Sequence, residues 1–166
     1  MRKAPCNSPS VCQKNTFFHE IKSNLLEFNY NSINFEHLIS CGEASTIGLR
    51  FGLIYLNFYR ISALGVPLEL NYMRGRYNVQ FEIGGGITTQ QVFQNYSKED
   101  GNYEENIIYT GLTGRVGARY QKPEGGLFLN GGFTPMLSLM NYKKIPIIAD
   151  NIFIPMFALG IGYTFK

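Results

Sequence analysis

The chain has 166 residues and a formal net charge of +3; charged residues make up only 16% of it, while aromatic residues, all Tyr or Phe, make up 14%. This length predicts a single domain, and the scattered Lys and Arg residues argue against a nucleic-acid-binding surface. The chain contains no run of about 18 apolar residues, which excludes a membrane-spanning helix.

The start of the chain is rich in Ser, Pro and Asn, and we predict a disordered leader over 1–14 followed by one domain over 15–166. Cys6 and Cys12 lie in this leader and could form a disulfide in an oxidising compartment or remain incidental thiols. Together with Cys41 they form no CxxC pair and have no His at ligand spacing, so we predict no metal site and no cofactor.

After the leader, apolar and polar residues alternate with a period of two, which is typical of β-strands. The predicted strands cover residues 17–22, 25–39, 47–55, 65–73, 79–88, 107–120, 127–137 and 152–165. In the second strand the apolar residues Ile33 and Phe35 are at odd positions, whereas Tyr30 and the apolar residues before it are at even positions. A bulge or turn near 31–32 would reconcile these two phases.

The third to fifth strands have one apolar face and one face that carries charge, amide or glycine. The apolar faces contain Ile47, Leu49, Phe51, Leu53, Tyr55, Val66, Leu68, Leu70, Tyr72, Val79, Phe81, Ile83 and Ile87. The opposite faces carry Arg50, Glu69 and Glu82. A polar segment over 90–105 then predicts a large loop.

The sixth strand places Arg115 and Arg119 on the face opposite its apolar residues. A short turn over 121–125 follows the sixth strand, and a longer loop over 141–151 follows the seventh. The last strand alternates most clearly. Its bulky face carries Phe153, Pro155, Phe157, Leu159, Ile161, Tyr163 and Phe165, whereas the side chains of its other face become small toward the end of the strand.

Together these patterns predict a closed antiparallel up-and-down transmembrane β-barrel of about eight strands. The face of each strand that carries small or polar side chains suits a narrow lumen, and the bulky apolar face suits contact with lipid. The strand lengths and the alternation of short and long connections agree with this prediction. Tyrosines near strand ends would form the girdles at the two membrane interfaces. They are Tyr30, Tyr55, Tyr72, Tyr120 and Tyr163.

The charged residues of the inward faces balance in number. They are Glu36, Arg50, Glu69, Glu82, Arg115 and Arg119. Since buried ions require partners, we predict a salt-bridge network that fills the lumen, and therefore a plugged barrel rather than an open pore. The alternative is that these charges are hydrated on the outside of a soluble barrel. No nucleophile lies near His19 or His37 in sequence, so we predict no catalytic residues and no enzyme activity.

Several segments of the sequence resemble those of small outer-membrane β-barrel proteins of Bacteroidetes-type bacteria. They are 32–38 (SINFEHL), 66–72 (VPLELNY), 81–88 (FEIGGGIT), 117–128 (GARYQKPEGGLF), 132–136 (GFTPM) and 159–165 (LGIGYTF). The resemblance covers about residues 25–166. It implies insertion by the barrel assembly machinery, which would recognise Leu159, Ile161, Tyr163 and Phe165 in the last strand. The terminal Lys166 and the missing signal peptide depart from the family pattern.

We therefore expect a non-enzymatic protein of the bacterial outer membrane, in contact with membrane lipid and not with nucleic acid, that has a structural or surface-interaction role through its longer loops. The loop partner is not identified. Since export requires a signal, we expect the given sequence to be a mature or truncated form, or its start to be misplaced. The alternative function is a soluble lipocalin-like barrel that binds a small apolar ligand in its interior.

Overall fold

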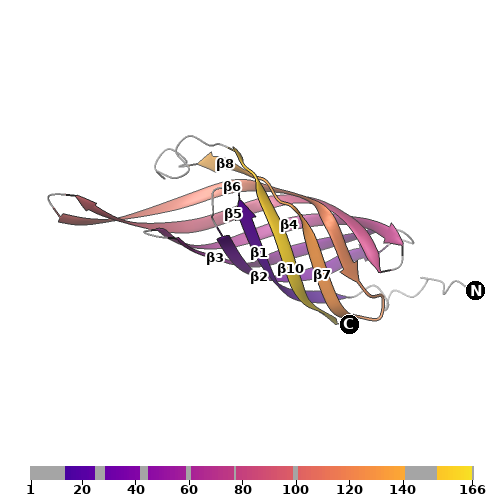
Figure 1. Cartoon of the computed structure of the whole chain (residues 1–166). Helices are drawn as coiled ribbons and strands as arrows, with labels where there is room; N and C mark the ends of the chain where they lie inside the picture. Colours follow the sequence, from indigo (N-terminus) through magenta and orange to yellow (C-terminus); the bar gives the residue numbers. More distant parts are fainter. Residues whose placement is uncertain are drawn as a thin grey trace, which may run out of the picture.

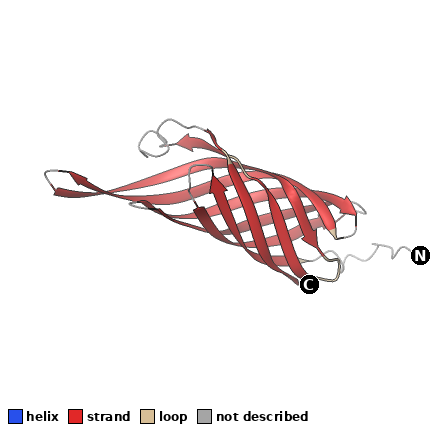
Figure 2. Cartoon of the chain, viewed as in Figure 1, coloured by secondary structure: helices blue, strands red, loops and turns tan. Residues whose placement is uncertain are grey.

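The structure, a computed structural model, describes residues 14–24, 29–41, 45–58, 61–76, 78–98, 101–140 and 153–165. The leader cysteines and the loop predicted at 141–151 lie outside these ranges, as does the predicted disordered state of residues 1–13. All regular structure in the described residues is β-strand (Figure 2). No helix within these ranges is long and apolar enough to cross a membrane.

Ten strand segments follow one another along the chain (Figure 1). They are β1 (Asn15–Asn24), β2 (Asn29–Cys41), β3 (Ser45–Phe58), β4 (Ile61–Arg76), β5 (Val79–Lys98), β6 (Gly101–Gln121), β7 (Gly126–Phe133), β8 (Met136–Met140), β9 (Phe153–Ile154) and β10 (Met156–Phe165).

Within the described residues these segments occupy eight positions of a closed antiparallel barrel. β7 and β8 both pair with β6 and are separated by Thr134 and Pro135, so they form one interrupted strand. β9 and β10 are likewise separated by Pro155, which has no amide hydrogen for a ladder bond. Each strand pairs with the next, and β1 pairs with β10 to close the cylinder. The predicted fold class is confirmed.

The outer face of the barrel is apolar. Side chains predicted to face outward are exposed, including Leu49 at 37%, Phe81 at 53% and Leu159 at 74%, whereas Arg50 is fully buried. A soluble barrel would show the reverse arrangement, so the structure gives no support to the lipocalin-like alternative. Among the strand residues whose side chains the structure describes, Arg74 near the end of β4 is the only Asp, Glu, Lys or Arg exposed on the outer face.

Two local predictions are wrong. Most of the segment 90–105 is not a loop, because β5 continues to Lys98 and pairs with β6 as far as Gly101. Figure 1 shows this hairpin projecting well beyond the other strands, at the end of the barrel away from both termini. Its polar residues are compatible with strand structure because ladder pairing satisfies the backbone while both faces can be solvated. The predicted bulge near 31–32 is also absent, since β2 keeps its register there and shifts instead between Leu38 and Ser40.

The interior has two zones. Toward the end that holds the termini it is polar and charged, but toward the long β5–β6 hairpin it is apolar. This second zone, the apolar cluster, comprises Tyr30, Ile54, Leu56, Ile61, Ala63, Val92, Ile107, Tyr109, Met136, Ile154 and Met156. Tyr30 is therefore buried inside the barrel at 4% exposure, and its predicted place in an interfacial girdle is wrong. Tyr55, Tyr72 and Tyr163 are exposed on the outer face, and Tyr120 is half-buried.

Candidate functional site: the ion network of the lumen

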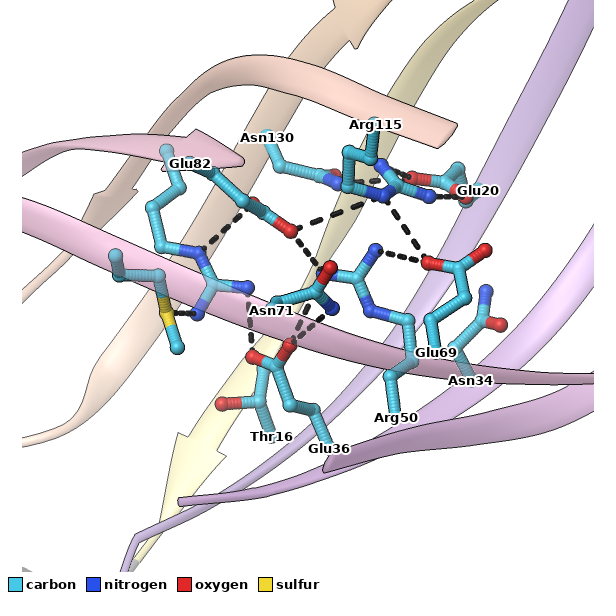
Figure 3. A network of polar contacts seen from close by, with 12 residues as sticks. Thr16, Glu20, Asn34, Glu36, Arg50, Glu69, Asn71, Glu82, Arg115 and Asn130 are labelled. Atoms are coloured by element: carbon cyan, nitrogen blue, oxygen red, sulfur yellow. Dashed lines mark hydrogen bonds and ion pairs between the residues drawn. The ribbon is translucent and has the colours of Figure 1, made fainter. Parts of the chain in front are cut away.

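Eight ionisable side chains meet in the polar zone of the lumen, four of each sign. The cations are Lys22, Arg50, Arg115 and Arg119, and the anions are Glu20, Glu36, Glu69 and Glu82. They come from β1 to β6, and Asn130 of β7 joins them through a hydrogen bond to Glu20. We call this set the ion network. Figure 3 shows Glu20, Glu36, Arg50, Glu69, Glu82, Arg115 and Asn130 reaching into the lumen from different strands.

Arg50 lies at the centre of the ion network. Its guanidinium is 2.7 Å from the carboxylate of Glu82, 3.1 Å from that of Glu36 and 3.2 Å from that of Glu69. These three carboxylates belong to different strands, β5, β2 and β4, so one side chain on β3 links four neighbouring positions of the barrel. A planar guanidinium with five donors suits this role, because it can satisfy several acceptors at once.

Arg115 links the opposite wall of the barrel to β1. Its two terminal nitrogens donate to the two oxygens of Glu20 at 2.8 and 2.9 Å, which is a bidentate pair. Its Nε donates to Glu69 at 3.1 Å. Lys22 adds a second cation beside Glu20 at 3.6 Å and Glu69 at 3.4 Å. Residues 95 positions apart in sequence are therefore joined across the lumen.

Arg119 completes the ion network toward the end that holds the termini. It forms ion pairs with Glu36 at 2.6 Å and with Glu82 at 3.2 Å. Its guanidinium also lies 4.9 Å from the ring centroid of Phe128, just as that of Arg50 lies 4.8 Å from Phe18. The two rings are 4.8 Å apart, so an aromatic pair is held between two cations.

Glycines on the inner faces provide the space for these side chains. A Cβ at Gly160 of β10 would collide with the amide oxygen of Asn130, and a Cβ at Gly84 of β5 would collide with that of Asn71. Asn71 in turn donates to Glu36 at 3.1 Å. The small inner face of the last strand, predicted from sequence to leave room inside the barrel, lies against these groups.

The structure places all six sequence-predicted lumen residues inside the barrel, each at 3% exposure or less, and brings them into contact with one another. Sequence reasoning missed Glu20 and Lys22, which lie two residues apart on the inner face of β1. Their spacing was a usable signal, but Phe18 shares their face and hides the polar pattern. The four residues predicted as the assembly signal, Leu159, Ile161, Tyr163 and Phe165, all face outward on β10.

The charges of the ion network compensate one another. Its carboxylates are all paired with cations, and in the described chain no three His, Cys, Asp or Glu side chains are arranged to hold a metal ion. His19 and His37 lie outside the lumen, on the outer faces of β1 and β2. The ion network therefore links the strands through charges that compensate one another, and its side chains occupy space inside the barrel.

Comparison with known proteins agrees with the architecture. No family model matches the chain, and no curated protein matches it. Among solved structures, the N-terminal β-barrel domain of Pseudomonas aeruginosa OprF has a TM-score of 0.61 at 13% identity, covering 92% of this chain and 98% of that one. Ail of Yersinia pestis has a TM-score of 0.58 at 11% identity, covering 92% of this chain and 95% of that one. The outer membrane enzyme PagL has a TM-score of 0.55 at 10% identity, covering 91% of this chain and 99% of that one.

At these identities the likeness shows the fold, which is that of the small bacterial outer-membrane β-barrels. The fold hosts an enzyme as well as other proteins, so it does not decide activity. The apolar outer face supplies an independent argument, because a continuous belt of exposed aliphatic and aromatic side chains on a closed barrel is stable only in a bilayer. The fold and the belt together make this chain an integral membrane protein of the outer-membrane barrel type.

Proposed function

We propose that this protein is a non-conducting, non-enzymatic barrel of the bacterial outer membrane that anchors the β5–β6 hairpin at the membrane surface. The observation that supports the proposal is that buried side chains occupy the interior of the barrel at two levels. The ion network occupies the lumen in the polar zone, and the apolar cluster occupies it toward the hairpin.

These two levels oppose ion flow for different reasons. In the ion network each charge is already compensated, so a passing ion would have to displace an existing pair from a site with little water to replace it. In the apolar cluster an ion would find no polar ligands except a few hydroxyl and amide groups, and a narrow apolar segment excludes water. A barrel of eight strands is just wide enough for side chains to fill it.

The hairpin is the part of the chain best suited to contacts. It extends beyond the other strands (Figure 1). Near the barrel its exposed side chains include the amides of Gln91 and Asn106, with Gln91 Nε2 donating to Asn106 Oδ1 at 3.2 Å, beside the apolar Phe93 and Ile108. Loops and hairpins displayed on a rigid scaffold commonly carry the interactions of a protein. We propose that its binding partner, which is not identified, meets this hairpin outside the cell.

Insertion belongs to the same proposal. The outward residues Leu159, Ile161, Tyr163 and Phe165 of β10 would be recognised by the barrel assembly machinery, and membrane lipid would then surround them. β10 pairs with β1 and so completes the cylinder.

Conductance tests the closure. Purified protein refolded into planar lipid bilayers in concentrated KCl should give no steady current steps, while circular dichroism and heat-modifiable gel mobility report that the barrel is folded. A matched variant that replaces Met136, Ile54 and Arg50 with Ser removes groups from both levels and should conduct if it folds. Steady unitary steps from the unaltered protein would refute the proposal.

Surface labelling tests the display of the hairpin. In a chain whose three native cysteines are changed to Ser, Asn106→Cys should react with a membrane-impermeant maleimide in intact cells. Glu124→Cys, which is exposed in the turn between β6 and β7 at the other end of the barrel, is the matched control and should react only after the outer membrane is permeabilised. The opposite labelling pattern would show that the hairpin points into the periplasm.

A further inference from the structure

A histidine lies in the apolar belt of the barrel. His19 is exposed on the outer face of β1, opposite Ile161 of β10 on one side and Ile33 of β2 on the other. Ile161 is the third of five outward residues of β10, which run from Phe157 to Phe165. Outward residues on a tilted strand are separated by roughly 5 Å in depth. His19 therefore lies inside the belt, between the exposed Phe17 and Ile21 of β1, and about one outward position from Asn31.

Hydrocarbon is an unfavourable environment for this side chain. A neutral imidazole has one hydrogen-bond donor and one acceptor, and lipid tails satisfy neither. His37, the other histidine, has its Nδ1 2.7 Å from Asn15 Oδ1. Within the described residues no hydrogen bond or ion pair involves the imidazole side chain of His19. An ionisable group inside a membrane commonly marks a functional contact and calls for a partner.

The surroundings of His19 define one face of the barrel. Asn31 is the nearest outward polar residue of β2 and stands opposite Ile21, one outward position beyond His19 along β1. Nearer the end of β10, the ring of Phe35 on β2 lies 5.2 Å from that of Phe51 on β3 and 6.5 Å from that of Phe165 on β10. We call the outer face of β1 and β2 around His19 and Asn31 the β1–β2 face.

We propose that the β1–β2 face binds a second copy of this chain in the membrane, with His19 of the two copies hydrogen-bonded to each other. Two copies inserted in the same direction are related by a twofold axis along the membrane normal, which brings residues of equal depth together. Imidazole and carboxamide groups each donate and accept, so each can pair with its own copy. In the described chain the face carries no Asp, Glu, Lys or Arg, so like charges do not oppose the contact.

Disulfide trapping in proteoliposomes tests this pairing. In the Cys-to-Ser background, Ile33→Cys places a thiol on the β1–β2 face, and Leu70→Cys places one on β4 as the matched control. These residues are 51% and 53% exposed and both face outward. On mild oxidation, Ile33→Cys should form a dimer on a non-reducing gel in excess over Leu70→Cys, whose yield measures random collision. Equal yields from the two variants would overturn the proposal.

Substitution of the histidine provides the second measurement. His19→Leu should weaken association by about threefold, as expected for one hydrogen bond between membrane segments, in a titration of protein against lipid followed by energy transfer between labelled copies. His19→Gln keeps a donor and an acceptor and should associate as the unaltered protein does. Heat-modifiable mobility identifies the folded fraction of each variant. Unchanged association of folded His19→Leu, or a monomer at every protein-to-lipid ratio, would overturn the proposal.

Discussion

Removing Arg115 tests whether the ion network is a dry, mutually dependent set of charges. In Arg115→Met, Glu20 loses both bonds of its bidentate pair and keeps only Asn130 at 2.8 Å and Lys22 at 3.6 Å. Removing one partner of a buried ion pair destabilises a protein by about 3–5 kcal/mol, because the remaining charge is left without compensation. We expect a loss in this range, since Glu69 also loses its contact with Arg115 at 3.1 Å.

A double-mutant cycle separates this coupling from the loss of packing. Glu20→Gln leaves Arg115 with Glu69, and the combined Glu20→Gln, Arg115→Met variant removes the uncompensated charge. We therefore expect the double variant to lose less free energy of unfolding than the sum of the single losses, with a coupling of about 0.5–3 kcal/mol.

The assay must suit a chain that contains no Trp. Unfolding in urea can be followed in detergent micelles by far-ultraviolet circular dichroism and by the fraction that keeps the mobility of the folded barrel in unheated gels. Lys122→Met, in the exposed turn after β6, controls for loss of a cation elsewhere and should change stability little. Single losses below about 1 kcal/mol that simply add would refute the reasoning, because they would mean that water already fills the lumen and hydrates each charge.

Three further predictions concern the belt, the inner glycines and the last strand. Leu70→Arg should lower the free energy of unfolding in lipid vesicles by about 2–4 kcal/mol in reversible urea titrations. Asn57→Arg, at an exposed position opposite Ser62 and beyond the belt, should lower it by about 1 kcal/mol or less, and equal losses would contradict the proposed membrane boundary. Gly160→Val should lower the free energy of unfolding by about 1–3 kcal/mol in the same titrations, because the added Cβ would displace Asn130. An unchanged urea midpoint would show that the lumen has space for the larger side chain. Phe165→Ser should slow insertion into vesicles that contain the purified assembly machinery but leave spontaneous folding in detergent unchanged, and equal rates with the machinery would exclude Phe165 from recognition.

Alternation alone was sufficient to predict the barrel and most of its inner face. Where a strand crosses the belt, lipid and lumen impose opposite requirements on neighbouring residues, and the period of two is then easy to read. This is the case for β3 to β6, where Arg50, Glu69, Glu82 and Arg115 all face inward as their spacing predicts. Position on a face is thus readable from sequence, but which acid meets which base is not, because partners such as Glu20 and Arg115 are far apart in the chain.

The errors have one physical origin, the edge of the membrane. Beyond the belt the exterior meets water, so the pattern inverts and apolar side chains point inward. Tyr30 is buried between the exposed residues Asn29 and Asn31, and Ile61 and Ala63 are buried on either side of the half-buried Ser62. The inversion in β2 explains the bulge predicted near 31–32, whereas the loop predicted over 90–105 depends on the polar composition of that segment. A change of phase in a predicted barrel strand can therefore mark where the strand leaves the hydrocarbon.

The cross-lumen pairing of Glu20 has a consequence for how the chain enters the bilayer. The carboxylate of Glu20 on β1 can pair with Arg115 only after β6 has been synthesised and the sheet has curved enough to bring the two strands together. Asn130, on β7, is synthesised later still. An incomplete sheet left among lipid tails would hold Glu20 with only Lys22, at 3.6 Å, to compensate its charge, so hairpin-by-hairpin entry should stall. We expect the nascent sheet to curl first, shielded at the membrane surface or by a chaperone, and to cross as a nearly finished ring.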